Sequence, residues 1–386
     1  MMAMTTAAIH QPGECESRVI WASMTFRLLV FACDCWQSEA NAGDGQGAKL
    51  LALTIDFIRR LVNCDGHKMF MQNFFSNGTS RPVLARLAVG LWALMFLLTG
   101  CGTWPFAESE PSPSAVAAKV ERNVVYGRVG NEVLTMDVYH PKNGGAKLPL
   151  VMYVHGGGWR MGDKEMLALM SGPTELLRRG YLVASVNYRL APEYKFPAML
   201  EDAKCAVRFL RANATVFNLA PDHIGVMGDS AGGHLVALMG LTDASAGFEG
   251  AGWTNESSRV QAVVDLYGPS DFSGGGTNLS RMAVRLFKEA FGPTNRTDSI
   301  IQRASPMTYV SSHAPPFLIF HGNSDGRVDI NQSLKLHERL LAAGADSTFV
   351  VITNYAHGAT AFARRASPDA LERSRLIADF FDRKLR

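Results

Sequence analysis

The sequence predicts an α/β fold with a mostly parallel, doubly wound sheet that carries helices on both faces. From about residue 120 onward, short apolar runs of strand character alternate with longer helical patterns. Such alternation is typical of parallel sheets buried between helices. The strand-like runs are residues 134–139, 148–154, 182–187, 224–227, 262–266, 316–320 and 348–352. Together they predict one domain over residues 121–386.

Helices are predicted where apolar residues recur at helical spacing between these runs. An apolar stripe from Leu200 to Leu210 follows Pro197, and proline is tolerated in a first turn because its missing N–H has no partner there. Residues 371–381 predict a second amphipathic helix near the C-terminus. We interpret both stripes as core packing, and Cys205 within the first as a small buried hydrophobe.

The composition is that of a globular protein of enzyme size. The chain has 386 residues, 47% of them hydrophobic and 19% charged, so it can bury at least one large core. Its formal net charge of +3 argues against a nucleic-acid partner. All cysteines but Cys205 lie in the first third of the chain, at Cys15, Cys33, Cys35, Cys64 and Cys101. The predicted domain therefore has no disulfide framework.

Residues 69–100 have the architecture of a signal peptide. Arg81 and Arg86 precede an uncharged apolar run that is short for a bilayer span. The run ends in Leu-Thr-Gly-Cys at Cys101, which resembles a bacterial lipoprotein processing site and implies lipidation of that cysteine. An uncleaved apolar anchor helix is the alternative. Either would tether the domain to a membrane outside the cytoplasm.

The regions on either side of this segment carry weaker signals. Residues 101–120 are rich in Pro and Ser and are expected to be a linker. Residues 1–68 show no connected pattern of elements. Because a signal peptide stands at the start of a chain, we expect translation to begin at Met69 or Met71.

The pattern G-x-S-x-G, typical of a nucleophilic serine on a sharp strand-to-helix turn, occurs twice. Ser230 follows the strand-like residues 224–227 and leads into a helical run that begins with small residues. Ser324 follows a strand near the end of the domain, where only one further strand remains to supply partners. Ser230 is therefore the predicted nucleophile.

A loop with three consecutive glycines, His-Gly-Gly-Gly-Trp at residues 155–159, follows the strand at 148–154. Its backbone N–H groups could stabilise the oxyanion of a tetrahedral intermediate, at about 3 kcal/mol per donor. The Ala231 N–H, next to the nucleophile, would complete this oxyanion hole. A phosphate cradle is disfavoured because the loop has neither G-x-G-x-x-G nor a Gly-Lys-Ser/Thr ending.

The base must be a histidine that follows the acid in the chain, if the order is serine, acid, histidine. His357 fits best, because it lies in a loop just beyond the last predicted strand. Three other histidines are less suitable: His321 precedes the acid, His337 falls within a helical run, and His155 belongs to the glycine loop.

Asp325 follows the penultimate predicted strand, where its carboxylate could accept the second imidazole N–H of His357. Two rivals remain open. Asp329 lies four residues later, where it could cap a helix, and Asp271 follows an earlier strand.

Taken together, these motifs resemble the hormone-sensitive-lipase-like branch of the α/β-hydrolases, and most closely its bacterial acetyl and feruloyl esterases. Residues 134–139, 185–193 and 196–198 also look like recurrent sequence of this family. The resemblance implies the triad Ser230, Asp325 and His357, with the amides of Gly157, Gly158 and Ala231 as oxyanion donors. It implies neither a cofactor nor a metal.

The implied reaction is hydrolysis of a small-molecule carboxylic ester through an acyl-enzyme. We expect a short acyl group, because the Gly-rich residues 244–257 are the main stretch available for a lid. An arylformamidase or other amidase is the alternative, since such enzymes also place a His-Gly-Gly-x-Trp loop ahead of the serine. A tethered binding module without turnover is a further alternative, because fold alone does not prove catalysis.

Overall fold

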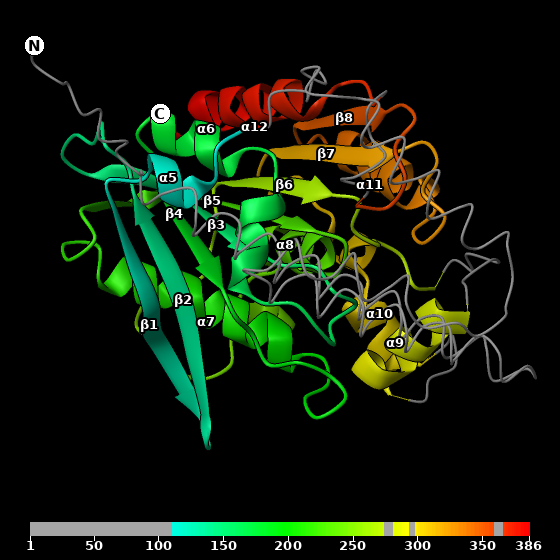
Figure 1. Cartoon of the computed structure of the whole chain (residues 1–386). Coiled ribbons are helices and arrows are strands. Elements are labelled where there is room, and N and C mark those ends of the chain that lie inside the picture. The colour runs from blue at the N-terminus through cyan, green and yellow to red at the C-terminus, as the bar shows by residue number, and fades with distance from the viewer. Residues whose placement is uncertain (1–109, 274–280, 293–297, 359–365) are drawn as a thin grey trace, which may run out of the picture. The chain divides into compact units, whose positions relative to one another are not determined.

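One mixed sheet of eight strands forms the centre of the domain in this computed structural model, which describes residues 110–273, 281–292, 298–358 and 366–386. The strands are β1 (Lys119–Val129), β2 (Glu132–His140), β3 (Leu148–Val154), β4 (Leu182–Val186), β5 (Leu219–Asp229), β6 (Ala262–Leu266), β7 (Phe317–Gly322) and β8 (Ser347–Ile352). Their order across the sheet is β1-β2-β4-β3-β5-β6-β7-β8 (Figure 1). β1, β2 and β4 pair antiparallel, and β4, β3 and β5 to β8 pair parallel. The predicted fold class is confirmed.

Every predicted strand is present, but the sequence analysis missed β1. This strand pairs antiparallel with β2 at the edge of the sheet. Within it only Tyr126 is fully buried, so it lacks the continuous apolar run by which buried strands are recognised.

Two separate apolar cores cover the two faces of the sheet, and β3 shows how the sequence divides between them. Leu150, Met152 and Val154 point into one core, whereas Val151 and Tyr153 point into the other. Successive side chains of a strand point to opposite faces, so a strand buried on both faces reads as apolar throughout.

The helices covering these faces are α6 (Pro173–Arg178), α7 (Ala198–Ala212), α8 (Ala231–Leu241), α11 (Asn331–Ala342) and α12 (Ala370–Leu385). Apolar residues of α7, α8 and α11 belong to the first core, and those of α6 and α12 to the second. α6 and α12 lie side by side along one face (Figure 1). The helices predicted around residues 200–210 and 371–381 correspond to α7 and α12.

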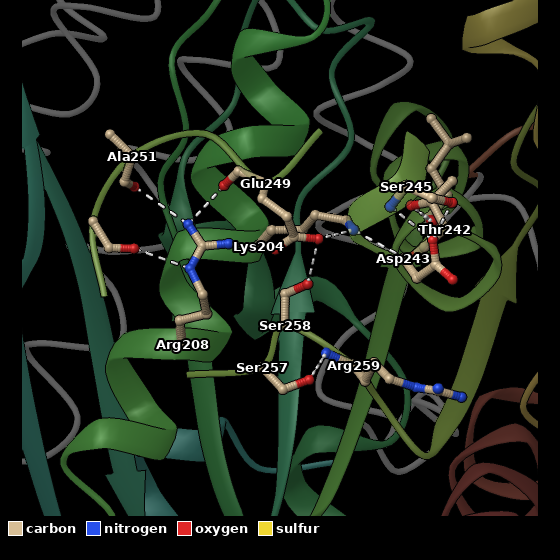
Figure 2. Close-up of polar contacts among 12 residues, drawn as sticks. Lys204, Arg208, Thr242, Asp243, Ser245, Glu249, Ala251, Ser257, Ser258 and Arg259 are labelled. Atoms are coloured by element: carbon tan, nitrogen blue, oxygen red, sulfur yellow. Dashed lines mark hydrogen bonds and ion pairs between the residues drawn. The ribbon is translucent and has the colours of Figure 1, made fainter. Parts of the chain in front are cut away.

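The Gly-rich stretch at residues 244–257 is not a lid. It follows the C-terminal end of α8, away from the serine that precedes that helix, and Glu249 fastens it to α7. Glu249 accepts hydrogen bonds from the buried Lys204 and Arg208, each at 2.7 Å (Figure 2). A buried cation requires a paired anion, so this loop is held by charge as well as by packing.

The end of the predicted linker belongs to the folded domain. A short helix, α5 (Pro113–Val116), precedes β1, and the Thr174 hydroxyl donates to the Pro111 carbonyl at 2.7 Å. Ser374 on α12 donates to the Glu110 carboxylate at 2.5 Å. Glu110 therefore contacts α12, and Pro111 and α5 contact α6.

The other predictions for the N-terminal region concern residues outside the described ranges. These are the doubtful extension at 1–68, the signal peptide at 69–100 and the lipidated Cys101. None of the helices in the described residues is both long and apolar enough to cross a membrane.

Candidate active site

Ser230 occupies a sharp turn between the end of β5 at Asp229 and the start of α8 at Ala231. Its backbone has φ 52° and ψ −116°, a conformation that costs a non-glycine residue about 1–3 kcal/mol. A Cβ on Gly228 would lie 2.5 Å from the Gly232 carbonyl oxygen, and a Cβ on Gly232 would lie 2.0 Å from that of Val154. Both glycines of the motif are thus required by close packing of helix against sheet.

Three side chains from the carboxyl ends of different strands meet at this turn. His357, beyond β8, places Nε2 2.7 Å from Ser230 Oγ. Its Nδ1 lies 2.7 Å from Oδ2 of Asp325, which follows β7. The carboxyl ends of parallel strands share one edge of a sheet, and this is why residues 127 positions apart come into contact.

Asp325 is surrounded by donors that favour its ionised form. Burial alone would raise its pKa, but hydrogen bonds from His321 and His357 hold the pKa of this carboxyl well below its usual range. Its Oδ1 accepts the backbone N–H groups of Arg327 at 2.8 Å and Val328 at 3.0 Å. A carboxylate held in this way can fix the tautomer and orientation of His357.

His321, which the sequence analysis set aside as a base, contacts the acid instead. It is fully buried, with Nε2 3.3 Å from Asp325 Oδ2 and 2.9 Å from the Val328 carbonyl oxygen. Its Nδ1 lies 2.7 Å from the Ser333 hydroxyl, which holds the ring on its other side. The spacing of His321 and Asp325, at the end of one strand, is the sequence signal for this contact.

The rival acids have local partners. Asp329 accepts the backbone N–H of Asn331 at 2.9 Å, and Asp271 accepts that of Ser273 at 2.8 Å. The rival serine, Ser324, donates to the side chain of its neighbour Asn323 at 3.1 Å. The contact to His357 is made by Asp325.

The rival histidines are also engaged in structural contacts. His337 lies 2.9 Å from the Ser347 hydroxyl. His155 is buried, stacks on Tyr188 with ring centroids 4.2 Å apart, and has Nδ1 2.7 Å from the Gly156 carbonyl oxygen. Burial lowers the pKa of His155 to about 4, so it is neutral at pH 7. It supports the shape of the glycine loop.

The glycine loop has a backbone that other residues would not adopt. Gly157 has φ +112° and Gly158 has φ +61°, and a Cβ on Gly157 would lie 2.1 Å from the Met161 carbonyl oxygen. Within the described ranges, the amides of Gly157, Gly158 and Ala231 donate no hydrogen bond to another residue. These three N–H groups, from the loop and from the turn beside it, are available to an oxyanion.

Trp159, at the end of this loop, packs in an aromatic cluster. Its indole N–H donates to Nδ1 of the buried His234 at 3.2 Å, and His234 Nε2 lies 2.7 Å from the Ala304 carbonyl oxygen. Phe272 and Phe291 contact the indole edge-on, with centroids 6.1 and 5.0 Å away. Burial lowers the pKa of His234 to about 4, which suits a neutral ring that accepts from the indole.

The segment that covers the glycine loop is the connection between β6 and β7. It contains α9 (Arg281–Phe291), α10 (Ser299–Ala304) and the 3₁₀ helix η3 (Pro306–Tyr309). Glu289 on α9 forms an ion pair with Arg160 at 3.2 Å, and the Ala290 carbonyl accepts the Phe196 N–H at 2.8 Å. The expectation that residues 244–257 are the main candidate lid is therefore wrong. The long gap between two predicted strands was the overlooked signal.

Tyr267 is a further residue that the sequence analysis missed. It follows β6 with φ 49° and is buried. Its ring meets the His357 ring edge-on at 4.9 Å between centroids, on a different element from Asp325. No local sequence pattern indicates this contact.

The arrangement can abstract a proton from Ser230 and stabilise an oxyanion beside it. His357 can take the proton at Nε2 while Asp325 accepts the Nδ1–H, as in serine hydrolases. In the described part of the chain, no group of three or more His, Cys, Asp or Glu side chains is placed to hold a metal ion.

Comparison with known proteins gives relatives that are named as esterases. The chain is 31% identical over 275 residues to Esterase LipQ of Mycobacterium tuberculosis, covering 70% of this chain and 62% of that protein. It is 28% identical over 252 residues to the isoprenylcysteine alpha-carbonyl methylesterase ICME of Arabidopsis thaliana, covering 62% of this chain and 56% of that protein. The chain thus spans less than two thirds of the length of these curated relatives.

Solved structures agree with the fold. A truncated carbohydrate esterase from gut microbiota shares 28% identity at a TM-score of 0.60, with 69% of this chain and 96% of that one covered. An acetyl ester-xyloside bifunctional hydrolase from Caldicellulosiruptor lactoaceticus shares 25% identity at a TM-score of 0.55, with coverages of 66% and 89%. The BD-FAE family matches residues 136–340, which contain the turn at Ser230, the glycine loop and Asp325. On this match and on the α/β-hydrolase architecture, the chain belongs to the BD-FAE family.

Proposed function

We propose that this protein is a serine carboxylesterase that hydrolyses short-chain carboxylic esters of small molecules through an acyl-enzyme. The single observation that carries the proposal is the continuous hydrogen-bonded contact from Ser230 through His357 to Asp325, at 2.7 Å for each step. The esterase names of the relatives support an ester over an amide as substrate.

In the proposed reaction, His357 Nε2 takes the Ser230 proton as Oγ attacks the ester carbonyl carbon. The carbonyl oxygen becomes an oxyanion, which the amides of Gly158 and Ala231 can receive together with that of Gly157. The tetrahedral intermediate collapses as His357 returns the proton to the leaving alcohol. A water, deprotonated by the same imidazole, then releases the acid and restores the serine.

The proposed substrate class is an acetyl or other short acyl ester, including one carried by a carbohydrate. Support comes from the carbohydrate esterase and the acetyl ester-xyloside hydrolase among the similar structures. The packing of α9 on the glycine loop also supports a short acyl group, since the Leu286 side chain lies directly against Gly158.

The test is hydrolysis of an aryl acetate by the full chain, beside Ser230→Ala and Ser324→Ala variants with unchanged circular-dichroism spectra. We expect the first variant to lose activity by at least about 10³-fold, while the second keeps it. A fluorophosphonate probe should label the wild type but not Ser230→Ala. An inert wild type that also resists the probe would refute the proposal.

We further propose that the catalytic domain is anchored outside the cytoplasm through a lipidated Cys101. The support is the charged, apolar and Leu-Thr-Gly-Cys pattern at residues 81–101. Metabolic labelling with a fatty-acid probe should mark the wild-type chain and the Cys205→Ala control, which changes a cysteine downstream of the signal-like segment, but not Cys101→Ala. Equal labelling of Cys101→Ala, or none of the wild type, would contradict the anchor.

A further inference from the structure

Asp229 occupies the variable position just before the nucleophile, and its carboxylate leaves the turn to contact the glycine loop. Its Oδ1 accepts the backbone N–H of Gly156 at 2.9 Å and the hydroxyl of Tyr153 at 2.7 Å. The Asp229 residue is 6% exposed and Tyr153 is fully buried. Neither donor comes from the turn itself, so the carboxylate joins two separate parts of the chain.

The approach of the two segments is too close for any side chain on Gly156. A Cβ there would lie 2.4 Å from Asp229 Oδ2 and 2.9 Å from the Asp229 carbonyl oxygen. The first glycine of the loop therefore serves a purpose different from that of Gly157 and Gly158, whose positive φ values shape the backbone. It allows the carboxylate to reach the loop amide.

The link lies between the two sources of oxyanion donors. The Ala231 amide belongs to the turn that Asp229 precedes, and the Gly157 and Gly158 amides follow Gly156 directly. The turn and the loop come from neighbouring strands, since Val154 of β3 pairs with Gly228 of β5. The sheet sets the spacing of these strands, but both groups of donors lie beyond the last residues of that ladder.

We propose that Asp229 is a positioning residue that locks the glycine loop to the nucleophile turn and so keeps the oxyanion donors aligned. This inference rests on the proposed esterase function for its catalytic readout. The physical reason is that each oxyanion donor is worth about 10²–10³-fold in kcat only when it points at the developing charge. A displacement of about 1 Å can cost about 10²-fold.

The test compares the full chain with three variants. Asp229→Ala removes both hydrogen bonds, Asp229→Asn keeps an oxygen that can accept from Gly156, and Tyr153→Phe removes only the second donor. We expect Asp229→Ala to lower kcat by about 10²-fold or more with KM changed by less than about threefold. The kcat of Asp229→Asn should stay within about tenfold of the wild-type value, and the kcat of Tyr153→Phe within about threefold.

Amide hydrogen exchange over residues 155–161 tests whether Asp229 holds the glycine loop, and it requires no substrate. Exchange should be faster than wild type in Asp229→Ala and near wild type in Tyr153→Phe. Should Asp229→Ala fail to fold, Gly156→Ala replaces it, because its methyl group would displace the carboxylate and is expected to give the same kcat defect.

Unchanged exchange in the loop of Asp229→Ala would overturn the inference, as would equal losses of kcat in Asp229→Ala and Asp229→Asn. The second result would assign the effect to charge and not to the hydrogen bond. A wild-type chain that hydrolyses no ester would refute the proposed function, while the exchange measurement would still decide whether Asp229 holds the loop.

Discussion

Leu286 on α9 lies where a side chain of Gly158 would stand: a Cβ at Gly158 would be 2.7 Å from the Leu286 Cδ1 methyl. The helix between β6 and β7 is therefore in direct contact with a residue proposed to donate to the oxyanion. α9 thus packs on the same loop that Asp229, the residue before Ser230, contacts through the Gly156 N–H.

Gly158→Ala is expected to lower kcat/KM by about 10²-fold, because the methyl group collides with Leu286 and φ +61° disfavours alanine. Adding Leu286→Ala should restore part of the loss by removing the collision but not the backbone strain. Gly145→Ala is the matched control, since a methyl group at that position would meet no atom within 4 Å. Steady-state kinetics measure kcat/KM for each variant. Wild-type activity in Gly158→Ala would contradict this prediction.

His321→Ala is expected to lower kcat by about tenfold or more and to reduce the free energy of unfolding by about 1.5–3 kcal/mol. The variant removes a buried imidazole that lies 3.3 Å from the Asp325 carboxylate. A hydrogen bond to a charged group contributes about 1.5–3 kcal/mol to stability. His337→Ala, which loses one contact to Ser347, is the control. Urea unfolding and aryl acetate kinetics measure both effects. Equal behaviour of the two variants would remove His321 from the site.

Asp265→Asn is expected to stabilise the protein at neutral pH. Burial raises the pKa of Asp265 from 3.8 to about 6, so the folded state resists an ionisation that the unfolded state accepts. The loss of folding stability caused by ionisation of Asp265 is nearly absent below about pH 4 and grows as the pH rises to 6. Above pH 6 it reaches at most about 3 kcal/mol. The asparagine can still accept the Gly268 N–H, which now donates at 2.8 Å.

Unfolding curves at pH 4 and pH 8 test the Asp265 prediction. The stability difference between Asp265→Asn and wild type should be near zero at the lower pH and positive at the higher one. Asp346→Asn, which replaces an exposed aspartate, controls for the substitution itself. A constant difference across this range would show that burial is not the cause.

Glu249→Ala is expected to destabilise the fold by about 3–5 kcal/mol, because it leaves Lys204 and Arg208 buried without their anion (Figure 2). Lys204→Met combined with Arg208→Met and Glu249→Leu should recover much of this loss. Chemical unfolding gives the free energies, and kcat per folded molecule should be unchanged because Glu249 lies away from the triad. A loss below about 1 kcal/mol would contradict the ionic role of this cluster.

The sequence alone determined the parallel core of the sheet, the family and the residues that meet at the turn. These features can be recognised from local sequence patterns: apolar runs between helical stripes, glycines around Ser230, and three consecutive glycines after a buried strand. Asp325 and His357 could be placed because chain order and strand ends restrict where an acid and a base can stand.

The tertiary structure decided the contacts between segments that carry no local pattern. β1 is an edge strand that shows no continuous apolar run, so only its pairing with β2 identifies it. The positions of α9 on the glycine loop and of Tyr267 against His357 depend on side-chain packing between distant elements. The link from Asp229 to Gly156 spans 73 positions in the chain, and hydrogen-bond geometry of that kind exists only once the sheet has brought the two strands together.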